Sequence, residues 1–167
     1  MFFKGIVQPN ILNIDETLRL RIYDGNFMIA LPWYQDEVVY YNSEGITDKL
    51  KIPNEEYVED MFDYLKEKGE VYFIEIKKDG VFTPIGDVTL KEENPPIVIG
   101  VPEYRGKGIG KKVMSAIINR AREIGIKRFY NAIIYDYNIA SQKMCESLGF
   151  KCVEVKGNER VYELIIV

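Results

Sequence analysis

Apolar residues recur along several segments of the chain at the spacing of one helix face, and these segments predict helices. In the segment 54–68 they fall at i, i+3, i+4 and i+7 from Val58, and Asn54 precedes them as a helix cap. The spacing Val113, Ile117, Ala121 and Ile124 predicts a helix over residues 108–123, and residues 33–43 also look helical. A fourth helix begins at Asn138 and carries an apolar row: Ala140, Met144 and Leu148.

Apolar runs bounded by turn residues predict the strands. Asp79-Gly80 is typical of a hairpin turn, and the Pro95-Pro96 pair precedes a short apolar run of the kind buried within a sheet. The predicted strands cover residues 17–23, 71–77, 81–90, 97–101, 128–135, 150–155 and 161–166. Because strands and helices alternate in the second half, the fold class is α/β (α+β), with helices on a mixed sheet. A length of 167 residues without a linker predicts one domain, 1–167.

Composition excludes several kinds of catalytic and binding site. The chain has no histidine, which removes Ser-His-Asp triads, Cys-His dyads and histidine metal ligands. Its two cysteines, Cys145 and Cys152, form no CxxC pair, so we expect no metal site and no disulfide framework. The net charge of −4 argues against nucleic acid as a partner, and no apolar run is long enough for a membrane helix. We therefore expect a cytoplasmic monomer or homodimer.

The most informative segment is the glycine-rich run 101–112, which follows a predicted buried strand and leads into a helix. Glycines let backbone N–H groups approach a ligand, and a helix start adds unpaired N–H groups and partial positive charge. Four side chains add full charges: Arg105, Lys107, Lys111 and Lys112. Together these features predict a diphosphate site. A turn that only caps the helix is the alternative.

Two familiar phosphate loops do not fit this run. A P-loop has four residues before its Gly-Lys pair, whereas five separate Gly100 from Gly106, and Gly108 stands where a hydroxyl should bind magnesium. The dinucleotide fingerprint is Gly-x-Gly-x-x-Gly, whereas this run is Gly-x-Gly-x-Gly and the expected acid after the next strand is missing. A nucleotide or phosphate-sugar binder is therefore a minor alternative.

The pattern Arg105-x-x-Gly108-x-Gly110 resembles the acetyl-CoA loop of the GNAT superfamily of N-acetyltransferases. The stretch 138–150 begins 28 residues after Gly110 and resembles that superfamily's helix with an asparagine start and a Leu-Gly-Phe end. The two motifs in this order make the resemblance strong over residues 70–167. The sequences of the two motifs are most similar to those of the branch that acetylates ribosomal proteins (Rim type). The acidic, aromatic first helix also resembles that of aminoglycoside 6′-N-acetyltransferases.

The resemblance implies a mixed, mostly antiparallel central sheet of about seven strands with a splayed central pair and four flanking helices. It implies acetyl transfer from acetyl-CoA, as co-substrate, to a primary amine of a small molecule or a protein N-terminus, without a metal. The strand 97–101 would pair with the pantetheine arm, because the strand 128–135 splays away from it. A non-catalytic module that binds coenzyme A is an alternative.

The resemblance also implies which residues contact the coenzyme. Backbone N–H groups of residues 105–110 would bind the pyrophosphate, and the backbone at Ile99 and Val101 would hold the thioester. Lys143 would reach the outer phosphate. Asn138 would bind the pantetheine, brace the splay or simply cap its helix. The full expected set is Ile99, Gly100, Val101, Arg105, Gly106, Lys107, Gly108, Ile109, Gly110, Lys111, Asn138 and Lys143.

Catalysis has to take a proton from the amine and supply one to the leaving thiolate. Many GNAT members use a tyrosine seven residues after the asparagine as the donor, where this chain has Cys145. An ordinary cysteine pKa of ~8.5 would match another thiol, although Cys145 also suits simple packing. Tyr135 and Tyr137 are alternative donors. The candidate bases are Asp87, Glu92, Glu93 and Asp136, and a bound water is the alternative.

The first predicted helix gathers aromatic and acidic residues where GNAT members build their acceptor pocket. These residues are Trp33, Tyr34, Asp36, Glu37, Tyr40 and Tyr41. Aromatic faces and carboxylates suit a cation. We therefore expect Trp33, Tyr34 and Asp36, together with Asp87, to bind the acceptor. The alternative is an amphipathic helix that buries its aromatic residues.

Overall fold

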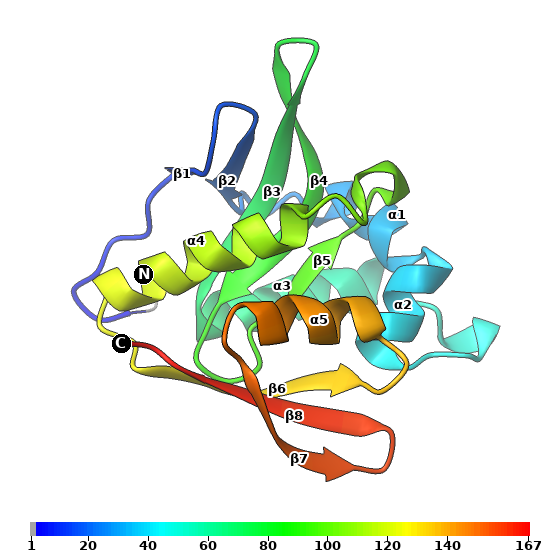
Figure 1. Cartoon of the computed structure of the whole chain (residues 1–167). Helices are drawn as coiled ribbons and strands as arrows, with labels where there is room; N and C mark the ends of the chain where they lie inside the picture. The colour runs from blue at the N-terminus through cyan, green and yellow to red at the C-terminus, as the bar shows by residue number, and fades with distance from the viewer. Residues whose placement is uncertain (1–2) are drawn as a thin grey trace.

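The computed structural model describes residues 3–167, which form two antiparallel sheets covered by helices (Figure 1). The first sheet has the order β1-β2-β3-β4-β5 and the second the order β6-β8-β7. The strands are β1 (Ile11–Asn13), β2 (Leu18–Ile22), β3 (Glu70–Lys78), β4 (Val81–Leu90), β5 (Ile97–Ile99), β6 (Arg128–Tyr135), β7 (Lys151–Lys156) and β8 (Glu159–Ile165). The α-helices are α1 (Leu31–Tyr34), α2 (Glu37–Glu44), α3 (Glu55–Lys68), α4 (Ile109–Glu123) and α5 (Ile139–Ser147). Among these residues, no helix is both long and apolar enough to cross a membrane.

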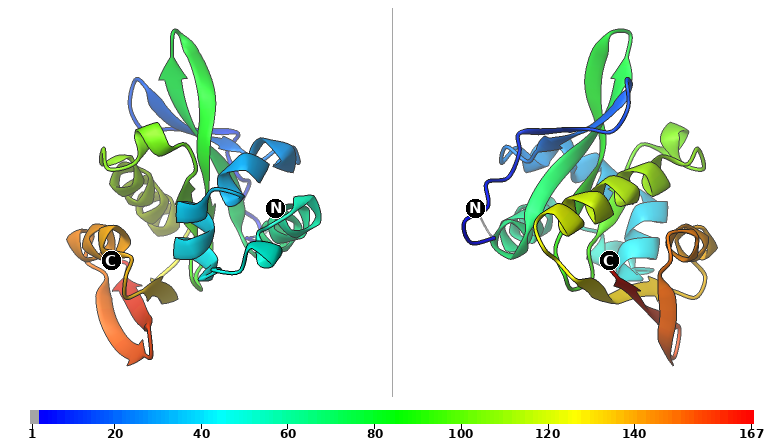
Figure 2. Two further views of the ribbon diagram at one scale, coloured as in Figure 1. Left: turned by 90° about the vertical axis from the view of Figure 1, so that its right-hand side faces the viewer. Right: turned by 60° about the vertical axis from the view of Figure 1, so that its left-hand side comes forward.

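Helices cover both faces of the first sheet. Figure 1 shows α4 and α5 in front of the strands and α3 behind them, and Figure 2 shows the same layers from two other sides. β3 lies in the middle of this sheet and is buried on both faces, which explains its continuous apolar run. Tyr72 and Ile74 pack into the core with α4, whereas Val71 and Phe73 pack into a second core with α3.

The two sheets meet at β5 and β6, which are joined only at one end within residues 3–167. There the Asn94 N–H donates to Tyr130 O over 2.8 Å. The next two residues, Pro95 and Pro96, have no N–H groups, so the ladder cannot continue along them. The Asn94 side chain instead accepts the N–H of Ile133 over 3.2 Å. β5 and β6 therefore separate beyond this point, and we call the space between them the fork.

The predicted mixed, mostly antiparallel architecture with a splayed pair is confirmed, but the numbers need correction. The described residues contain eight strands in two sheets and five α-helices, rather than about seven strands and four helices. The extra strand β1 has only three residues, too few for a periodic pattern. The predicted helix 33–43 is divided into α1 and α2. Asp36 causes the break because it is extended and caps α2 by accepting the N–H groups of Val38 and Val39.

The buried face of α5 also differs from the predicted one. Its buried side chains are Gln142 and Cys145, whereas Ala140 is exposed. Gln142 Nε2 donates to the carbonyl oxygens of Tyr135 and Asp136 over 2.9 and 3.0 Å. A polar side chain therefore faces the interior because it closes the turn between β6 and α5, which an apolar row cannot indicate.

A buried ion pair fixes α4 against β3. Glu70 is 2% exposed, and Arg120 Nε and Nη2 donate to its two carboxylate oxygens over 3.0 and 2.9 Å. The Tyr72 hydroxyl donates to the same carboxylate over 2.7 Å. Because both charges are satisfied, the pair holds the helix in one position on the sheet.

Replacing Arg120 by Met leaves the Glu70 carboxylate buried without its cation. We expect the free energy of unfolding, measured by urea denaturation, to fall by about 3–5 kcal/mol. Arg122→Met, on the exposed side of the same helix, is the control and should cost less than about 1 kcal/mol. An equal loss in both variants would contradict the role of the buried pair.

Candidate active site

The loop between β5 and α4 presents unpaired backbone donors. Gly106 and Gly108 have φ angles of 71° and 78°, in the left-handed region that favours glycine. α4 starts directly after Gly108 without a side-chain cap, and the Lys112 N–H donates to Gly108 O. The N–H groups of residues 108–111 therefore have no acceptor within the helix, and the helix dipole adds partial positive charge. The loop thus offers main-chain amides to an anion.

These amides line a cavity of about 390 Å³, which we call the loop cavity. Its other walls come from α2, β5 and α5: Val38, Val39, Asn42, Ser43, residues 97–99, Asn138, Ala140, Ser141 and Met144. Lys111 lines the cavity, and Lys107 is exposed in the loop beside it. Within residues 3–167 neither lysine makes an ion pair, whereas Lys112 lies 3.1 Å from Asp15. Two of the three lysine charges are therefore available to an anion.

The Arg105 side chain ties the loop to two other elements. Its Nε donates to Ile99 O over 3.0 Å, and its Nη2 donates to Gly100 O and to Asp36 Oδ1, each over 3.2 Å. Because Asp36 also caps α2, this contact holds the end of β5 against the start of α2. The Arg105 N–H donates within the preceding turn. The amides open to an anion are therefore those of residues 106–110.

β5 offers one unpaired edge to the fork. In an antiparallel pair, alternate residues turn their N–H and C=O groups toward the partner. Pro96 O and Gly100 N–H bond to β4 over 3.1 and 2.7 Å, so the N–H groups of Ile97 and Ile99 point toward the fork. The Val101 N–H donates to the same β4 carbonyl as Gly100, over 3.2 Å. For this reason β5 ends at Ile99, rather than at residue 101 as predicted.

Gly100 is required by the packing beneath β5. A Cβ at this position would lie 2.1 Å from Trp33 Cγ. Trp33 is 6% exposed and meets Phe73 edge-on, with 6.2 Å between ring centroids. Trp33 lies outside the residues that line the cavities described here. It supports the site as a core residue.

A second cavity of about 340 Å³ lies between β5 and β6, and we call it the fork cavity. Seven residues line both cavities: Asn42, Ser43, Ile97, Val98, Asn138, Ser141 and Met144. Asn138 also caps α5, because its Oδ1 accepts the Ser141 N–H over 3.3 Å. The two cavities therefore meet along β5, and a ligand held at the loop amides can extend along this strand into the fork.

The chain, with its glycine-rich loop beside a splayed strand pair, was compared with known protein families. The profile of the Acetyltransferase (GNAT) family matches residues 33–150. The chain belongs to the GNAT family. A search of curated protein sequences found no significant match.

Solved structures share this GNAT fold. A domain from Methanocaldococcus jannaschii has a TM-score of 0.77 at 24% identity, over 90% of this chain and 99% of that one. The Microcin C7 self immunity acetyltransferase MccE, in complex with acetyl-CoA and AMP, has a TM-score of 0.68 at 17% identity, over 95% and 98%. RimL, a ribosomal L7/L12 alpha-N-protein acetyltransferase in complex with coenzyme A, has a TM-score of 0.68 at 15% identity, over 93% of this chain and 98% of that one. The expected GNAT membership is confirmed, and a Rim-type enzyme is among the structural relatives.

Asp87 is the most deeply buried of the predicted GNAT site residues. It lies on β4 opposite Val98 and is 0% exposed. The Tyr34 hydroxyl donates to its Oδ1 and Oδ2 over 3.1 and 3.0 Å, and Tyr34 lines the fork cavity. Burial raises the pKa of the Asp87 carboxyl to about 7, although the Tyr34 hydrogen bond opposes the rise. This carboxyl therefore changes protonation near neutral pH, directly behind the cavity wall.

Cys145 lines the fork cavity and is 6% exposed. Burial, and then the charge of Glu146, raise the pKa of its thiol to about 11. We predicted that the pKa of Cys145 would match that of the leaving thiol. This prediction is wrong, because it assumed an ordinary cysteine pKa. The thiol stays protonated at neutral pH, but giving its proton to a thiolate of ordinary pKa is uphill by roughly 3 kcal/mol.

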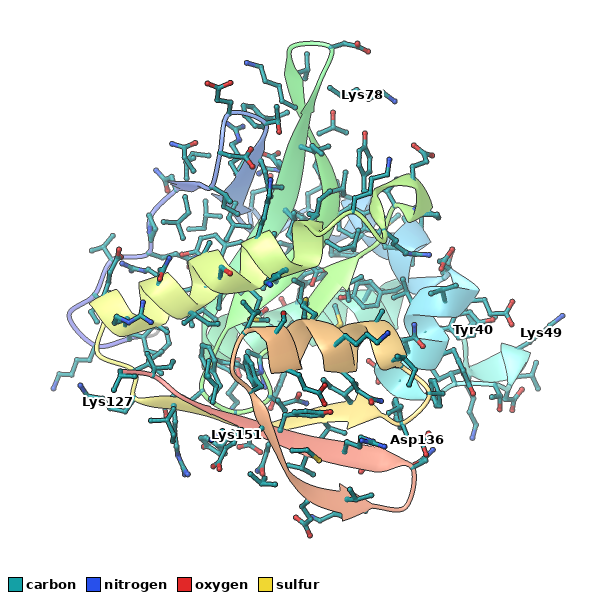
Figure 3. The ribbon with its side chains drawn as sticks, viewed as in Figure 1. Tyr40, Lys49, Lys78, Lys127, Asp136 and Lys151 are labelled. Atoms are coloured by element: carbon teal, nitrogen blue, oxygen red, sulfur yellow. The ribbon has the colours of Figure 1, made fainter. Side chains whose placement is uncertain are left out.

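The other predicted proton donors lie at the outer end of β6. Tyr135 and Tyr137 stack with ring centroids 5.3 Å apart, and Tyr137 stacks on Tyr41 at 4.2 Å. The Tyr137 hydroxyl donates to Tyr41 O over 2.6 Å, so the three rings tie α2 to β6. Asp136 is exposed in the turn that follows β6 (Figure 3). None of these four residues is among those that line the two cavities.

The remaining predicted residues lie at the margins of the site. Glu92 and Glu93 are exposed where the two sheets join. Lys143 is exposed on α5. Of the four residues expected to bind the acceptor, only Tyr34 lines a described cavity, and Asp87 stands behind it.

The fork cavity also contains residues that the sequence did not single out. Glu44, Tyr64 and Lys91 line it, and Lys91 Nζ lies 5.8 Å from the Tyr64 ring centroid. Burial lowers the pKa of Lys91. Lys91 directly follows the last residue of β4, where strand alternation no longer indicates its direction. Glu44 and Tyr64 come from helices whose packing no local pattern indicates.

The pKa of Asp87 predicts how stability depends on pH. Because the folded carboxyl has a pKa of about 7 and the unfolded one about 3.8, the folded state binds the proton more tightly. Its contribution to stability is therefore full below about pH 4 and is lost as the pH rises through 7. We expect Asp87→Asn to gain up to about 4 kcal/mol relative to wild type between pH 4 and 8, measured by urea denaturation. A stability difference that stays constant over this range would contradict the assignment.

Proposed function

We propose that the chain transfers an acetyl group from acetyl-CoA to a primary amine, which attacks the thioester directly. The observation that carries this proposal is the unpaired edge of β5, which runs from the loop cavity into the fork cavity. A ligand that fits both has a diphosphate at one end and an extended amide-bearing arm that ends in a thioester. Coenzyme A carrying an acetyl group has this chemistry.

The loop cavity suits the diphosphate end. The amides of residues 106–110 donate hydrogen bonds to the pyrophosphate oxygens, and the positive end of α4 favours their charge. Lys107 and Lys111 add two unpaired cations next to these amides. Lys143, exposed on α5, would reach the outer phosphate. Binding at this end should therefore weaken as salt is added.

The edge of β5 suits the pantetheine arm. An extended arm with two amide groups accepts from the Ile99 N–H and donates to the Ile97 carbonyl as an added strand would, because the Ile99 carbonyl already accepts from Arg105. Asn138 lies where the two cavities meet, and because its Oδ1 caps α5, its Nδ2 is the group that can donate to the arm. The thioester then lies in the fork beside the Ile97 N–H, because Ile97 lines both cavities and Ile99 lines only the loop cavity.

The same edge supplies the chemistry of transfer. As the amine nitrogen bonds to the carbonyl carbon, negative charge develops on the carbonyl oxygen, and the Ile97 N–H is the donor that stabilises it. The carbon–sulfur bond then breaks, and the sulfur takes up a proton from the nitrogen that has just been acylated. Apolar side chains of the fork cavity, among them Ile97, Val98 and Met144, reduce the access of water to the thioester.

The acceptor enters from the fork cavity, as an amine of a small molecule or of a protein N-terminus. The fork cavity has a volume of about 340 Å³, which lies in the range of small-molecule sites. The Glu44 carboxylate and the phenols of Tyr34 and Tyr64 are groups that attract an ammonium. The structural relatives include an alpha-N-protein acetyltransferase and a self immunity acetyltransferase, so both kinds of acceptor belong in the test.

The activity is tested with acetyl-CoA and a panel of peptides with free N-termini, polyamines and aminoglycosides. We expect release of the coenzyme thiol, measured with a thiol reagent, that depends on an amine from one of these classes. Tight coenzyme binding without thiol release on any amine would contradict transfer and would support a non-catalytic coenzyme A module.

Gly108→Val tests the coenzyme site. Valine is strained at a φ of 78° and places a branched side chain beside the amides. We expect coenzyme A to bind about 100-fold more weakly by calorimetry, a loss of about 2.7 kcal/mol. Gly125→Val at the other end of α4 is the matched control, because Gly125 has a φ of 89° and equally open surroundings. The control should change the Kd less than about twofold, and an equal loss in both would show that strain, not the site, weakens binding.

A further inference from the structure

Three carboxylates are buried among residues 3–167, and Asp87 differs from the other two. Glu70 is paired with Arg120, and Glu75 accepts hydrogen bonds from Arg19 Nε and Arg21 Nε, each over 2.8 Å. Arginine side chains therefore compensate the charge of both of these carboxylates.

Asp87 has no cation beside it. Its hydrogen-bond partner is the neutral Tyr34 hydroxyl, which reaches both carboxylate oxygens. A buried carboxylate with one neutral donor weakens the fold above neutral pH. An asparagine of the same size would accept the same hydrogen bond without that cost, so structure alone does not explain the aspartate.

The position of the pair suggests what it does. Tyr34 lines the fork cavity, and its hydroxyl donates to the carboxylate of Asp87, which is not among the lining residues. Asp87 also lies opposite Val98, one residue from Ile97, whose N–H points toward the fork. Tyr34 therefore connects the cavity proposed for the amine with a buried carboxylate.

We propose that Tyr34 and Asp87 together accept the proton that the ammonium form of the acceptor must lose before it attacks, with Tyr34 touching the amine and Asp87 storing the proton. This inference rests on the proposed acetyl transfer and assigns the base of that reaction.

The proton balance is complete without another reactant. The Tyr34 oxygen takes a proton from the ammonium group as its own hydroxyl proton moves to an Asp87 oxygen, so the phenol stays neutral and the carboxylate becomes a carboxylic acid. The neutral amine then forms the carbon–nitrogen bond, and the second nitrogen proton goes to the departing sulfur. Asp87 finally returns its proton through Tyr34 to solvent.

The surroundings keep this pair active near neutral pH. Other ionisable groups that interact electrostatically with the pair are Tyr23 after β2, Glu44 of α2 and Tyr57 of α3. None of these is a cation that would hold Asp87 charged. Burial places the pKa of Asp87 at about 7, where a base that has to bind and release a proton in each cycle is most effective.

Two isosteric variants and one control test the relay. Tyr34→Phe removes the transfer atom, and Asp87→Asn removes the proton store while keeping an acceptor for Tyr34. Thr89→Val is the control, because Thr89 is buried on the same face of β4 as Asp87 and its hydroxyl has no hydrogen-bond partner. Each is assayed with acetyl-CoA and the best amine found for wild type, and coenzyme A binding is measured by calorimetry.

We expect each relay variant to lose about 100-fold or more in kcat, with an unchanged Kd for coenzyme A, and the double variant to be no slower than either single one. The acid limb of the wild-type kcat/KM profile, near pH 7, should disappear in Asp87→Asn. Thr89→Val should keep the wild-type rate and profile. Relay variants that keep the wild-type kcat and pH profile would overturn the relay but leave acetyl transfer intact, whereas a wild-type protein inactive on every amine would overturn acetyl transfer itself.

A second measurement needs no acceptor amine. The carboxyl carbons of the aspartates, followed by ¹³C NMR as the pH is raised, should include one that titrates near pH 7. That signal should be missing in Asp87→Asn and retained in Thr89→Val. Titration of every aspartate near pH 4 would overturn the relay, because Asp87 would then be unable to hold the proton at neutral pH.

Discussion

The site depends on a strand edge that no other part of the sheet pairs with. β5 and β6 are joined at Asn94 and Tyr130, and then two consecutive prolines remove the N–H groups that would have continued the ladder. Unpaired backbone groups at a sheet edge are normally covered or blocked. Here the edge faces an internal passage lined by the loop cavity and the fork cavity. A ligand that behaves as a strand can occupy it, and in the proposed function this is how a chain without a histidine positions a reactive thioester.

The rest of the structure holds that passage open. Arg105 fixes the end of β5 to the cap of α2, and the Glu70–Arg120 pair fixes α4 to β3, so the elements that flank the passage are anchored to the rest of the fold. Trp33 fills the space beneath Gly100, where no side chain other than glycine's hydrogen fits. Paired charges thus maintain the frame, while Asp87, the one buried carboxylate without a cation among residues 3–167, lies at the centre that we propose for the reaction. This distribution is typical of sites that give up some stability for function.

The sequence predicted most of the secondary structure and the loop, because these depend on local patterns. The period of α3 and α4, the turn at Asp79-Gly80 and the glycines at 106 and 108 are all signals within a few residues. The break at Asp36 was missed because its cap competes with a continuous helical pattern. The partners of Asp87 and Arg105 lie 53 and 69 residues away along the chain, and no local pattern encodes such pairings. The raised pKa of Cys145 depends on how deeply its thiol is buried, and a residue type and its spacing do not give that depth.

The most direct measurement is a crystal structure of the protein with coenzyme A bound. The pyrophosphate is predicted to accept hydrogen bonds from the amides of residues 106–110, the pantetheine to pair with Ile97 and Ile99, and the sulfur to lie in the fork near the Ile97 N–H. A complex in which the coenzyme lies elsewhere, with β5 unoccupied along its fork-facing edge, would contradict the central role of that edge.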